Sequence, residues 1–250
     1  MPDPFDFYLS SPVVWNGGVF VGSGDGNVYA LNAGSGTLQW KFKTGDVIHA
    51  SPAIADNSLF IGSWDSYFYA LDAATGEEKW RFKTGEDPDT HNQVGIQSSQ
   101  GSWVIGSPAV ADGKVYFATS DSGLFYSFAA KTGSPLFSLK FQGWPMFSSP
   151  AIAGNLIYIG SHMGKLIAID TAAQKVSWMF ETDGAKQNTA AWTKPDGTPN
   201  YEAEFASDFY DDLVTGVSKM MSIGAILSSP VVVGRVIYFG SADGNLYALM

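Results

Sequence analysis

The sequence predicts an all-β fold, a β-propeller of about five four-stranded blades, and two recurring phrases lead to this prediction. The stretch "ALDAATGEEKW" at 70–80 returns as "ALNAGSGTLQW" at 30–40 and as "AIDTAAQKVSW" at 168–178. A Ser-Pro pair followed by two apolar residues starts each unit, and its prolines are Pro12, Pro52, Pro108, Pro150 and Pro230. A basic period of about 40 residues that carries four short strands is typical of propeller blades.

The first unit, residues 11–45, shows how the strands are delimited. Its four β-rich runs are separated by NGG, GDGN and GSG. Such turn pairs supply the positive φ angles that tight hairpins between antiparallel strands require. The units lack a 3.6-residue apolar periodicity, which excludes a helical solenoid.

The recurring stretch that ends in tryptophan places a turn between the third and fourth strands. In the copy at 70–80, Asp72 and Thr75 are expected to hydrogen-bond the turn backbone, and Gly76 supplies a permissive φ. The tryptophan begins the outermost strand, where a large ring packs against the neighbouring blade. We therefore predict a structural, blade-docking role, rather than a ligand role, for Trp40, Asp72, Thr75, Gly76, Trp80, Asp170 and Trp178.

The pattern Ala-x-Asp-x-x-Thr-Gly-x-x-x-Trp, with Ser-Pro starts and Gly-Ser-x-Asp-Gly turns, resembles the repeat of the PQQ-like β-propellers. That family includes the quinoprotein alcohol dehydrogenases and the lipoprotein of the Bam complex. The copy at 70–80 matches fully, whereas Asn32 and Ser35 replace Asp and Thr in the first copy. In another copy Ala173 and Gln174 replace Thr-Gly, so that turn must close differently. The resemblance implies a bacterial protein of the periplasm or cell envelope, and a ring of seven or eight blades.

We expect one domain over 1–250 that carries two insertions, 85–105 and 181–227. The last unit ends at "NLYALM", after its third strand. Only a short segment near Phe5 to Tyr8 is available to supply the fourth strand. The alternatives are an incompletely closed ring and a fragment of a larger propeller, and an exposed edge strand would favour self-association.

Both insertions connect a fourth strand to the next first strand, so they fall on one face of the propeller, together with the turns between second and third strands. Loops that grow on one face of a rigid scaffold are typical of a binding face. The candidate ligand-binding residues on this face are His49, Trp64, Asp65, His91, Trp144 and His162. Ordinary loop packing is the alternative for each of them. No metal site is predicted, although Glu86, Asp87 and Asp89 beside His91 could hold a cation or form a solvated acidic loop.

The larger insertion contains a predicted amphipathic helix within 200–222. Its apolar residues Phe205, Phe209, Leu213 and Val217 recur every four positions. Acidic residues occupy the other side, which favours a cap over the propeller rather than a membrane-active helix.

Composition excludes several function classes. The formal charge of −10 argues against binding nucleic acid through its phosphates. Zero cysteines exclude thiol catalysis and a disulfide scaffold. No run of residues is apolar and long enough to span a membrane as a helix, and the first residues do not form an export signal.

The sequence therefore favours a non-enzymatic binding or scaffold propeller, with a protein or small-molecule partner on the inserted face and no cofactor. No phosphate-binding loop, paired-His metal motif or serine-nucleophile elbow is present. The alternative, implied by the resemblance, is a PQQ- and calcium-dependent oxidoreductase or a fragment of one. In that case Trp64 or Trp144 would stack on the quinone and Asp65 would serve as a base. Binding of a small ligand in the axial channel is a third alternative.

Overall fold

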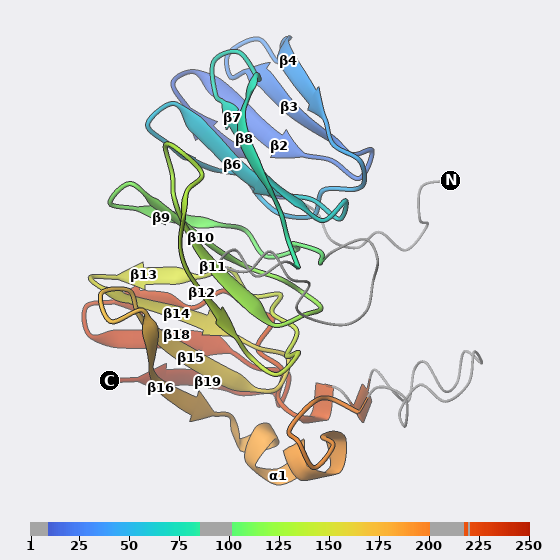
Figure 1. The fold of residues 1–250 in the computed structure, drawn as a ribbon, viewed down its shortest axis with the longest axis vertical. Coiled ribbons are helices and arrows are strands. Elements are labelled where there is room, and N and C mark those ends of the chain that lie inside the picture. The colour runs from blue at the N-terminus through green and yellow to red at the C-terminus, as the bar shows by residue number, and fades with distance from the viewer. Residues whose placement is uncertain (1–9, 86–101, 201–217, 220) are drawn as a thin grey trace, which may run out of the picture. The chain divides into compact units, whose positions relative to one another are not determined.

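The structure is a computed structural model that describes residues 10–85, 102–200, 218–219 and 221–250 (Figure 1). These residues form five antiparallel sheets, four with four strands and one with three, and they include the helix α1. Within each sheet the strands pair in the order in which they occur in the sequence, as in propeller blades. The prediction of about five blades that are incompletely closed is thus confirmed.

The chain divides into two compact units, Met1–Leu139 and Lys140–Met250. The first unit contains three blades, which follow one another along the chain. The first blade consists of β1 (Val13–Trp15), β2 (Gly18–Gly22), β3 (Asn27–Asn32) and β4 (Leu38–Lys43). The second consists of β5 (Ala53–Ala55), β6 (Ser58–Gly62), β7 (Tyr67–Asp72) and β8 (Glu78–Lys83). The third consists of β9 (Ala109–Ala111), β10 (Lys114–Ala118), β11 (Leu124–Ala129) and β12 (Pro135–Lys140).

The second unit contains two further blades and the helix. The fourth blade consists of β13 (Ala151–Ala153), β14 (Leu156–Gly160), β15 (Lys165–Asp170) and β16 (Lys175–Glu181). Helix α1 (Asp183–Trp192) follows directly. The fifth blade has β17 (Val231–Val233), β18 (Val236–Gly240) and β19 (Leu246–Leu249).

The hairpin turns form where glycine and asparagine permit a left-handed backbone. Asn16 and Gly17, between β1 and β2, have φ angles of 45° and 76°. Two successive positive φ angles define the turn whose twist matches that of antiparallel strands. Buried aromatic rings fill the space between the second and third blades, where Phe68 of β7 stacks on Phe117 of β10 with 3.8 Å between ring centroids.

Two of the recurring tryptophans, Trp40 and Trp80, join adjacent blades through the turn of the next blade, whereas Trp178 is 37% exposed. The indole N–H of Trp40 donates a hydrogen bond to the carbonyl oxygen of Ala73 at 3.1 Å. A Cβ atom on Gly76 would lie 2.6 Å from the Trp40 ring, so the glycine leaves room for the indole of the preceding blade. Trp80 repeats the contact, because it donates to the Ala130 carbonyl at 3.0 Å and its ring lies against Gly133. The glycine and the tryptophan of the repeat therefore act as a pair that spans two blades.

The aspartate of the same turn organises its backbone. Asp72 Oδ1 accepts hydrogen bonds from the N–H groups of Ala74 and Thr75, at 2.9 and 3.1 Å. Asp170 does the same in the fourth blade, where Thr-Gly is absent. Gln174 adopts a φ of 53° there and takes the left-handed position that glycine holds elsewhere.

The insertion 181–227 contains a helix that the sequence did not predict. Helix α1 starts at Thr182, whose Oγ1 accepts a hydrogen bond from Ala185 N. Its sequence, DGAKQNTAAW, has no continuous apolar stripe, so only this N-cap could have indicated it. The predicted helix at 200–222 falls mostly outside the described residues, and the residues described there, 218–219 and 221–222, are helical. No described helix is both long and apolar enough to cross a membrane.

Candidate functional site

Three connections are anchored by an aliphatic side chain four residues before the Ser-Pro proline, namely Ile48, Val104 and Ile226. Ile48 packs against Gly22, where an added Cβ would lie 2.3 Å from Ile48 Cγ2. Val104 packs in the same way against Gly62, at the end of β6. The anchor residues are fully or almost fully buried. They fix the neighbouring residues of each connection beside the turns between second and third strands.

Three aromatic residues gather at this position in the first unit, and we call His49, Trp64 and Trp103 the aromatic cluster. The rings of His49 and Trp64 meet edge to face, with 4.7 Å between centroids. Trp64 stacks on Trp103 at 4.8 Å and an interplanar angle of 9°. Trp103 is 43% exposed, whereas His49 is buried. The cluster thus presents one face of an indole to solvent.

The sequence interpretation included His49 and Trp64 but missed Trp103. Trp103 lies five residues before Pro108, the same offset at which Val47 precedes Pro52. Alignment on the Ser-Pro pairs would therefore have placed it beside the other two. The insertion 85–105 obscured this register, since the repeat is interrupted immediately before Trp103.

Two polar atoms, one in the cluster and one in the adjacent turn of the third blade, are buried without a hydrogen-bond partner among the described residues. They are the indole nitrogen of Trp64, a donor, and Oδ1 of Asp121, an acceptor. Burial raises the pKa of Asp121 to about 6, against the opposing effect of hydrogen bonds from Ser102 and from the backbone of Trp103. Ser120 links the same turn to the cluster, because its backbone N–H donates to the Trp103 carbonyl at 2.9 Å.

Asp121 differs from the other turn aspartates in the spacing to its tyrosine. In the first, second and fifth blades the tyrosine follows four residues later and donates its hydroxyl to the aspartate at 2.6 Å; these pairs are Asp25–Tyr29, Asp65–Tyr69 and Asp243–Tyr247. In the third blade Tyr126 stands five residues after Asp121 and pairs across the sheet with Phe117. The Tyr126 hydroxyl accepts a hydrogen bond from Gly85 N at 3.1 Å. One extra residue in this hairpin thus explains why the carboxylate lacks the partner that its counterparts have.

Asp65, a predicted ligand residue, is engaged by the protein itself. Its Oδ2 accepts hydrogen bonds from the Gly45 N–H at 2.7 Å and from the Tyr69 hydroxyl, and its Oδ1 accepts from Tyr67 N at 2.9 Å. Burial and the adjacent carboxylate raise the pKa of Tyr69, which keeps the phenol protonated. Asp65 therefore joins the end of the first blade to a turn of the second.

The second unit holds two more of the predicted residues, Trp144 and His162. The Trp144 indole donates to the Gly197 carbonyl at 3.3 Å, and Lys165 Nζ lies 5.2 Å from the centre of its ring. His162 is buried against Phe147, with 4.4 Å between ring centroids, and burial lowers its pKa to about 4. His162 follows the Gly-Ser pair of its turn, as Trp64 does in the second blade, so the two blades share this ring-on-ring contact.

His91, the remaining predicted residue, lies outside the described residues. In the part of the chain that the structure describes, no three His, Asp or Glu side chains are grouped so that they could hold a metal ion.

Comparison with known proteins shows the family to which the chain belongs. The sequence profile described as outer membrane protein assembly factor BamB matches residues 8–101 and 96–250. The predicted resemblance to PQQ-like propeller repeats is thereby confirmed. Comparison with curated proteins gives no match.

Solved structures show the same fold at low identity. A quinohemoprotein alcohol dehydrogenase from Comamonas testosteroni is 17% identical with a TM-score of 0.69, over 97% of this chain and 41% of that chain. The computationally designed Ika8 protein is 16% identical with a TM-score of 0.65, over 96% of this chain and 57% of that chain. The quinohemoprotein alcohol dehydrogenase ADHIIG from Pseudomonas putida HK5 is 19% identical with a TM-score of 0.57, over 79% and 38%. The chain thus spans 57% or less of the length of each of these structures.

Proposed function

The chain belongs to the family of the outer membrane protein assembly factor BamB, and we propose that it acts as a non-enzymatic binding propeller of the bacterial cell envelope. Its partner is a protein segment held on the face that carries the connections between blades. The family description supports a role in assembly with other proteins. The aromatic cluster supports this location of the binding site.

The unpaired atoms beside the cluster are the observation that carries this proposal. Buried polar groups in proteins are nearly always hydrogen-bonded, so the Trp64 indole and the Asp121 carboxylate favour a ligand with both an acceptor and a donor. Every non-proline residue of a peptide backbone supplies one of each. The exposed ring of Trp103 adds an apolar surface of the kind that is enriched at protein interfaces. An extended peptide segment meets all three requirements.

A selection from phage-displayed random peptides, performed on the full chain, tests the proposal. Enriched peptides are labelled, and their dissociation constants are measured by fluorescence anisotropy. We expect Trp103→Ala and Asp121→Asn each to weaken binding by about tenfold or more, as for central interface residues. Leu38→Ala, which removes an exposed side chain from β4, serves as the control and should leave binding unchanged. Absence of enriched peptides, or equal affinity for the Trp103→Ala variant, would overturn the proposal.

The second candidate function, a PQQ- and calcium-dependent oxidoreductase, is favoured by the likeness in fold to quinohemoprotein alcohol dehydrogenases. The described residues do not fit the quinone well. One face of Trp64 is covered by Trp103, and His49 packs against the same indole. Trp144 is in contact with Phe141 and Lys165, and both oxygens of Asp65 already accept hydrogen bonds. We therefore derive no reaction step for this candidate.

Titration with PQQ, with and without calcium, separates the two candidates. Tryptophan fluorescence and calorimetry report binding to the purified chain. The binding-propeller proposal predicts no saturable binding of PQQ. Saturable micromolar binding that Trp64→Ala or Trp144→Ala weakens would replace it with the oxidoreductase.

A further inference from the structure

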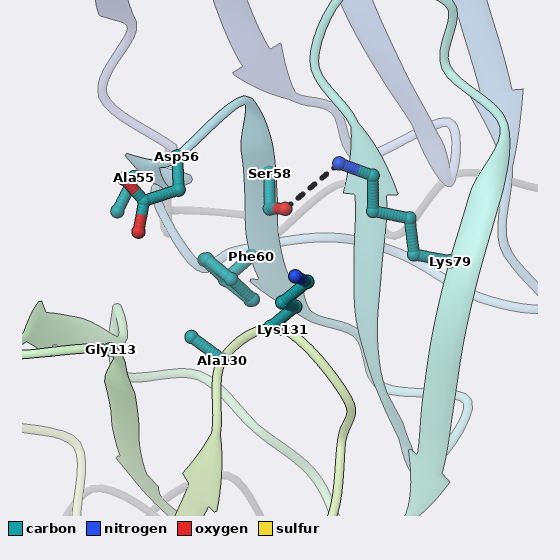
Figure 2. A pocket seen from close by; sticks show the side chains of 8 residues that line it. All are labelled: Ala55, Asp56, Ser58, Phe60, Lys79, Gly113, Ala130 and Lys131. Atoms are coloured by element: carbon teal, nitrogen blue, oxygen red, sulfur yellow. Dashed lines mark hydrogen bonds between the residues drawn. The ribbon is translucent and has the colours of Figure 1, made fainter.

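A cavity of about 620 Å³ lies between the second and third blades (Figure 2). It is bordered by turns between first and second and between third and fourth strands, which lie at the opposite strand ends from the aromatic cluster. The turn between β5 and β6 borders it on one side, and the turns of the third blade border it on the other. The residues that line it and that the argument uses are Ala55, Ser58, Phe60, Lys79, Ala130 and Lys131.

The repeat explains why this groove between blades is open. Ala55 ends the first strand of its blade and pairs with Ser58; Trp15 is its counterpart in the first blade and pairs with Gly18. The Trp15 ring packs onto the apolar core between the first and second blades. Replacement of this indole by the methyl group of Ala55 leaves space in the next groove.

The groove between the second and third blades carries two lysines at positions where the preceding groove has uncharged residues. The position of Lys79, directly before Trp80, is Gln39 in the first blade. The position of Lys131, directly after the carbonyl that accepts the tryptophan N–H, is Ala74 in the preceding groove. Both lysines line the cavity, and its walls carry one carboxylate, that of Asp56. Because Asp72 pairs with Lys79, Lys131 is the cation of the wall that has no acidic partner among the described residues.

The two lysines differ in their engagement. Lys79 Nζ donates to the Asn57 carbonyl at 2.8 Å and to Ser58 Oγ at 3.0 Å, and it lies 3.1 Å from Asp72 Oδ2. These contacts fix its position on the wall, as Figure 2 shows for Ser58. Lys131 is exposed, and its ammonium group has no ion pair or hydrogen bond within the described ranges. It is thus available to a ligand without breaking an interaction of the protein.

We propose that this cavity binds an organic anion that has an apolar body and a carboxylate head. The head lies against Lys131, with Lys79 as the fixed second charge. The apolar body occupies the space above Ala55 and Ala130, under which the ring of Phe60 is buried. Ligand sites with mainly apolar walls and a few convergent polar groups have volumes of this order, about 300–1,000 Å³. This site is independent of the peptide-binding function proposed above.

The test uses 4-phenylbutyrate as the probe and the uncharged 4-phenylbutyramide as its matched analogue, with binding to the full chain measured by calorimetry. We expect saturable binding of the carboxylate that is weaker at high salt, and binding of the amide that is about tenfold weaker or more. Ala55→Trp restores the side chain of the first blade and should abolish binding. Lys131→Gln should raise the dissociation constant about tenfold. The control, Lys41→Gln, removes an exposed lysine from β4 and should have no effect.

Three outcomes would overturn the proposal. They are no binding at millimolar probe, equal affinity for the acid and the amide, and unchanged affinity in Lys131→Gln. The lysine variant keeps the test decisive if Ala55→Trp fails to fold, because the exposed Lys131 side chain has no structural contact to lose. Peptide binding in the phage selection should persist in both variants, so failure of this site is distinguishable from failure of the proposed function.

Discussion

Asp121 is half-buried and His162 is buried, and burial shifts the pKa values of these two residues in opposite directions. Because the pKa of Asp121 is raised from 3.8 to about 6, the folded chain binds more protons than the unfolded chain between these values. The free energy of unfolding therefore falls as pH rises through this window, and the loss is complete above pH 6. Asp121→Asn removes this pH-dependent loss of stability. We therefore expect the free energy of unfolding of the variant, relative to that of the wild type, to increase by about 1–3 kcal/mol from pH 4 to pH 7.5.

Urea unfolding at both pH values measures this difference. The comparison with the wild type cancels the effect of the other carboxylates. Asp25 is an example: its pKa is lowered from 3.8 to about 2, so its stabilising contribution is lost only below pH 4. An equal difference between variant and wild type at both pH values would contradict the assignment of a raised pKa to Asp121.

His162 should make the second unit sensitive to acid. Burial lowers its pKa from 6.5 to about 4, so the unfolded chain binds more protons between these values. Stability due to the neutral ring is present above pH 6.5 and is lost as pH falls towards 4, by up to about 3 kcal/mol. We expect His162→Gln to unfold with a smaller pH dependence across this range. Titration of the imidazole by NMR gives the pKa directly, and a value near 6.5 would contradict the burial of His162.

Residues that follow the repeat could be predicted from the sequence, and residues that depart from it could not. The repeat pattern alone indicated a docking role for Trp40, and the hydrogen bond from Trp40 to the Ala73 carbonyl is consistent with that role. Asp121 Oδ1 lacks a partner because one extra residue precedes Tyr126, and this single added residue is not visible as a change of motif. Trp103 lies at the end of an insertion, where the register of the repeat is lost. The candidate site consists largely of such departures.

At the scale of the element, the contact between Trp40 and the next turn should dominate the effect of glycine substitution. Gly76 and Gly36 occupy the same position of successive turns, with φ angles of 76° and 72°. An added Cβ at Gly76 would lie 2.6 Å from the Trp40 ring, whereas nothing lies within 4 Å at Gly36. Gly36→Ala therefore isolates the backbone cost, about 1–2 kcal/mol. We expect Gly76→Ala to destabilise by about 1–3 kcal/mol more, as overpacking does.

Chemical denaturation of the two variants measures this difference, and Gly133→Ala should resemble Gly76→Ala because its Cβ would meet Trp80. Equal destabilisation by Gly36→Ala and Gly76→Ala would mean that the indole moves away without cost.

Strands were more predictable than the helix for a physical reason. Each hairpin turn needs positive φ angles, and the residues that tolerate them, such as Asn16 and Gly17, are visible in the sequence. Helix α1 is short and mainly polar, and it depends on the Thr182 cap and on packing of Trp192 in the second unit. Packing of that kind is a tertiary property that no local pattern encodes.

At the scale of the whole molecule, the repeats determine the fold and the differences between repeats determine the candidate sites. The second blade has Ala55 where the first has Trp15, and this difference opens the cavity without disturbing the pairing of the strand. In the same way, a longer hairpin in the third blade leaves Asp121 Oδ1 without the tyrosine hydroxyl that its counterparts have. A propeller tolerates such changes because each blade is a complete sheet whose strands pair with their neighbours in sequence.

The edge of the fifth blade leads to the last prediction, that the chain self-associates. Among the described residues β19 pairs on one side only, with β18. Leu246 on this strand is 77% exposed, and Trp178 of the fourth blade is 37% exposed. An unprotected apolar edge strand pairs readily with another chain.

We expect light scattering coupled to chromatography to show a mass that rises with protein concentration, and we expect Leu246→Lys to lower this mass to that of one chain. Val14→Lys changes a comparably exposed valine in the first blade and should leave association intact. A single-chain mass at every concentration, or association that survives Leu246→Lys, would show that the edge is already protected.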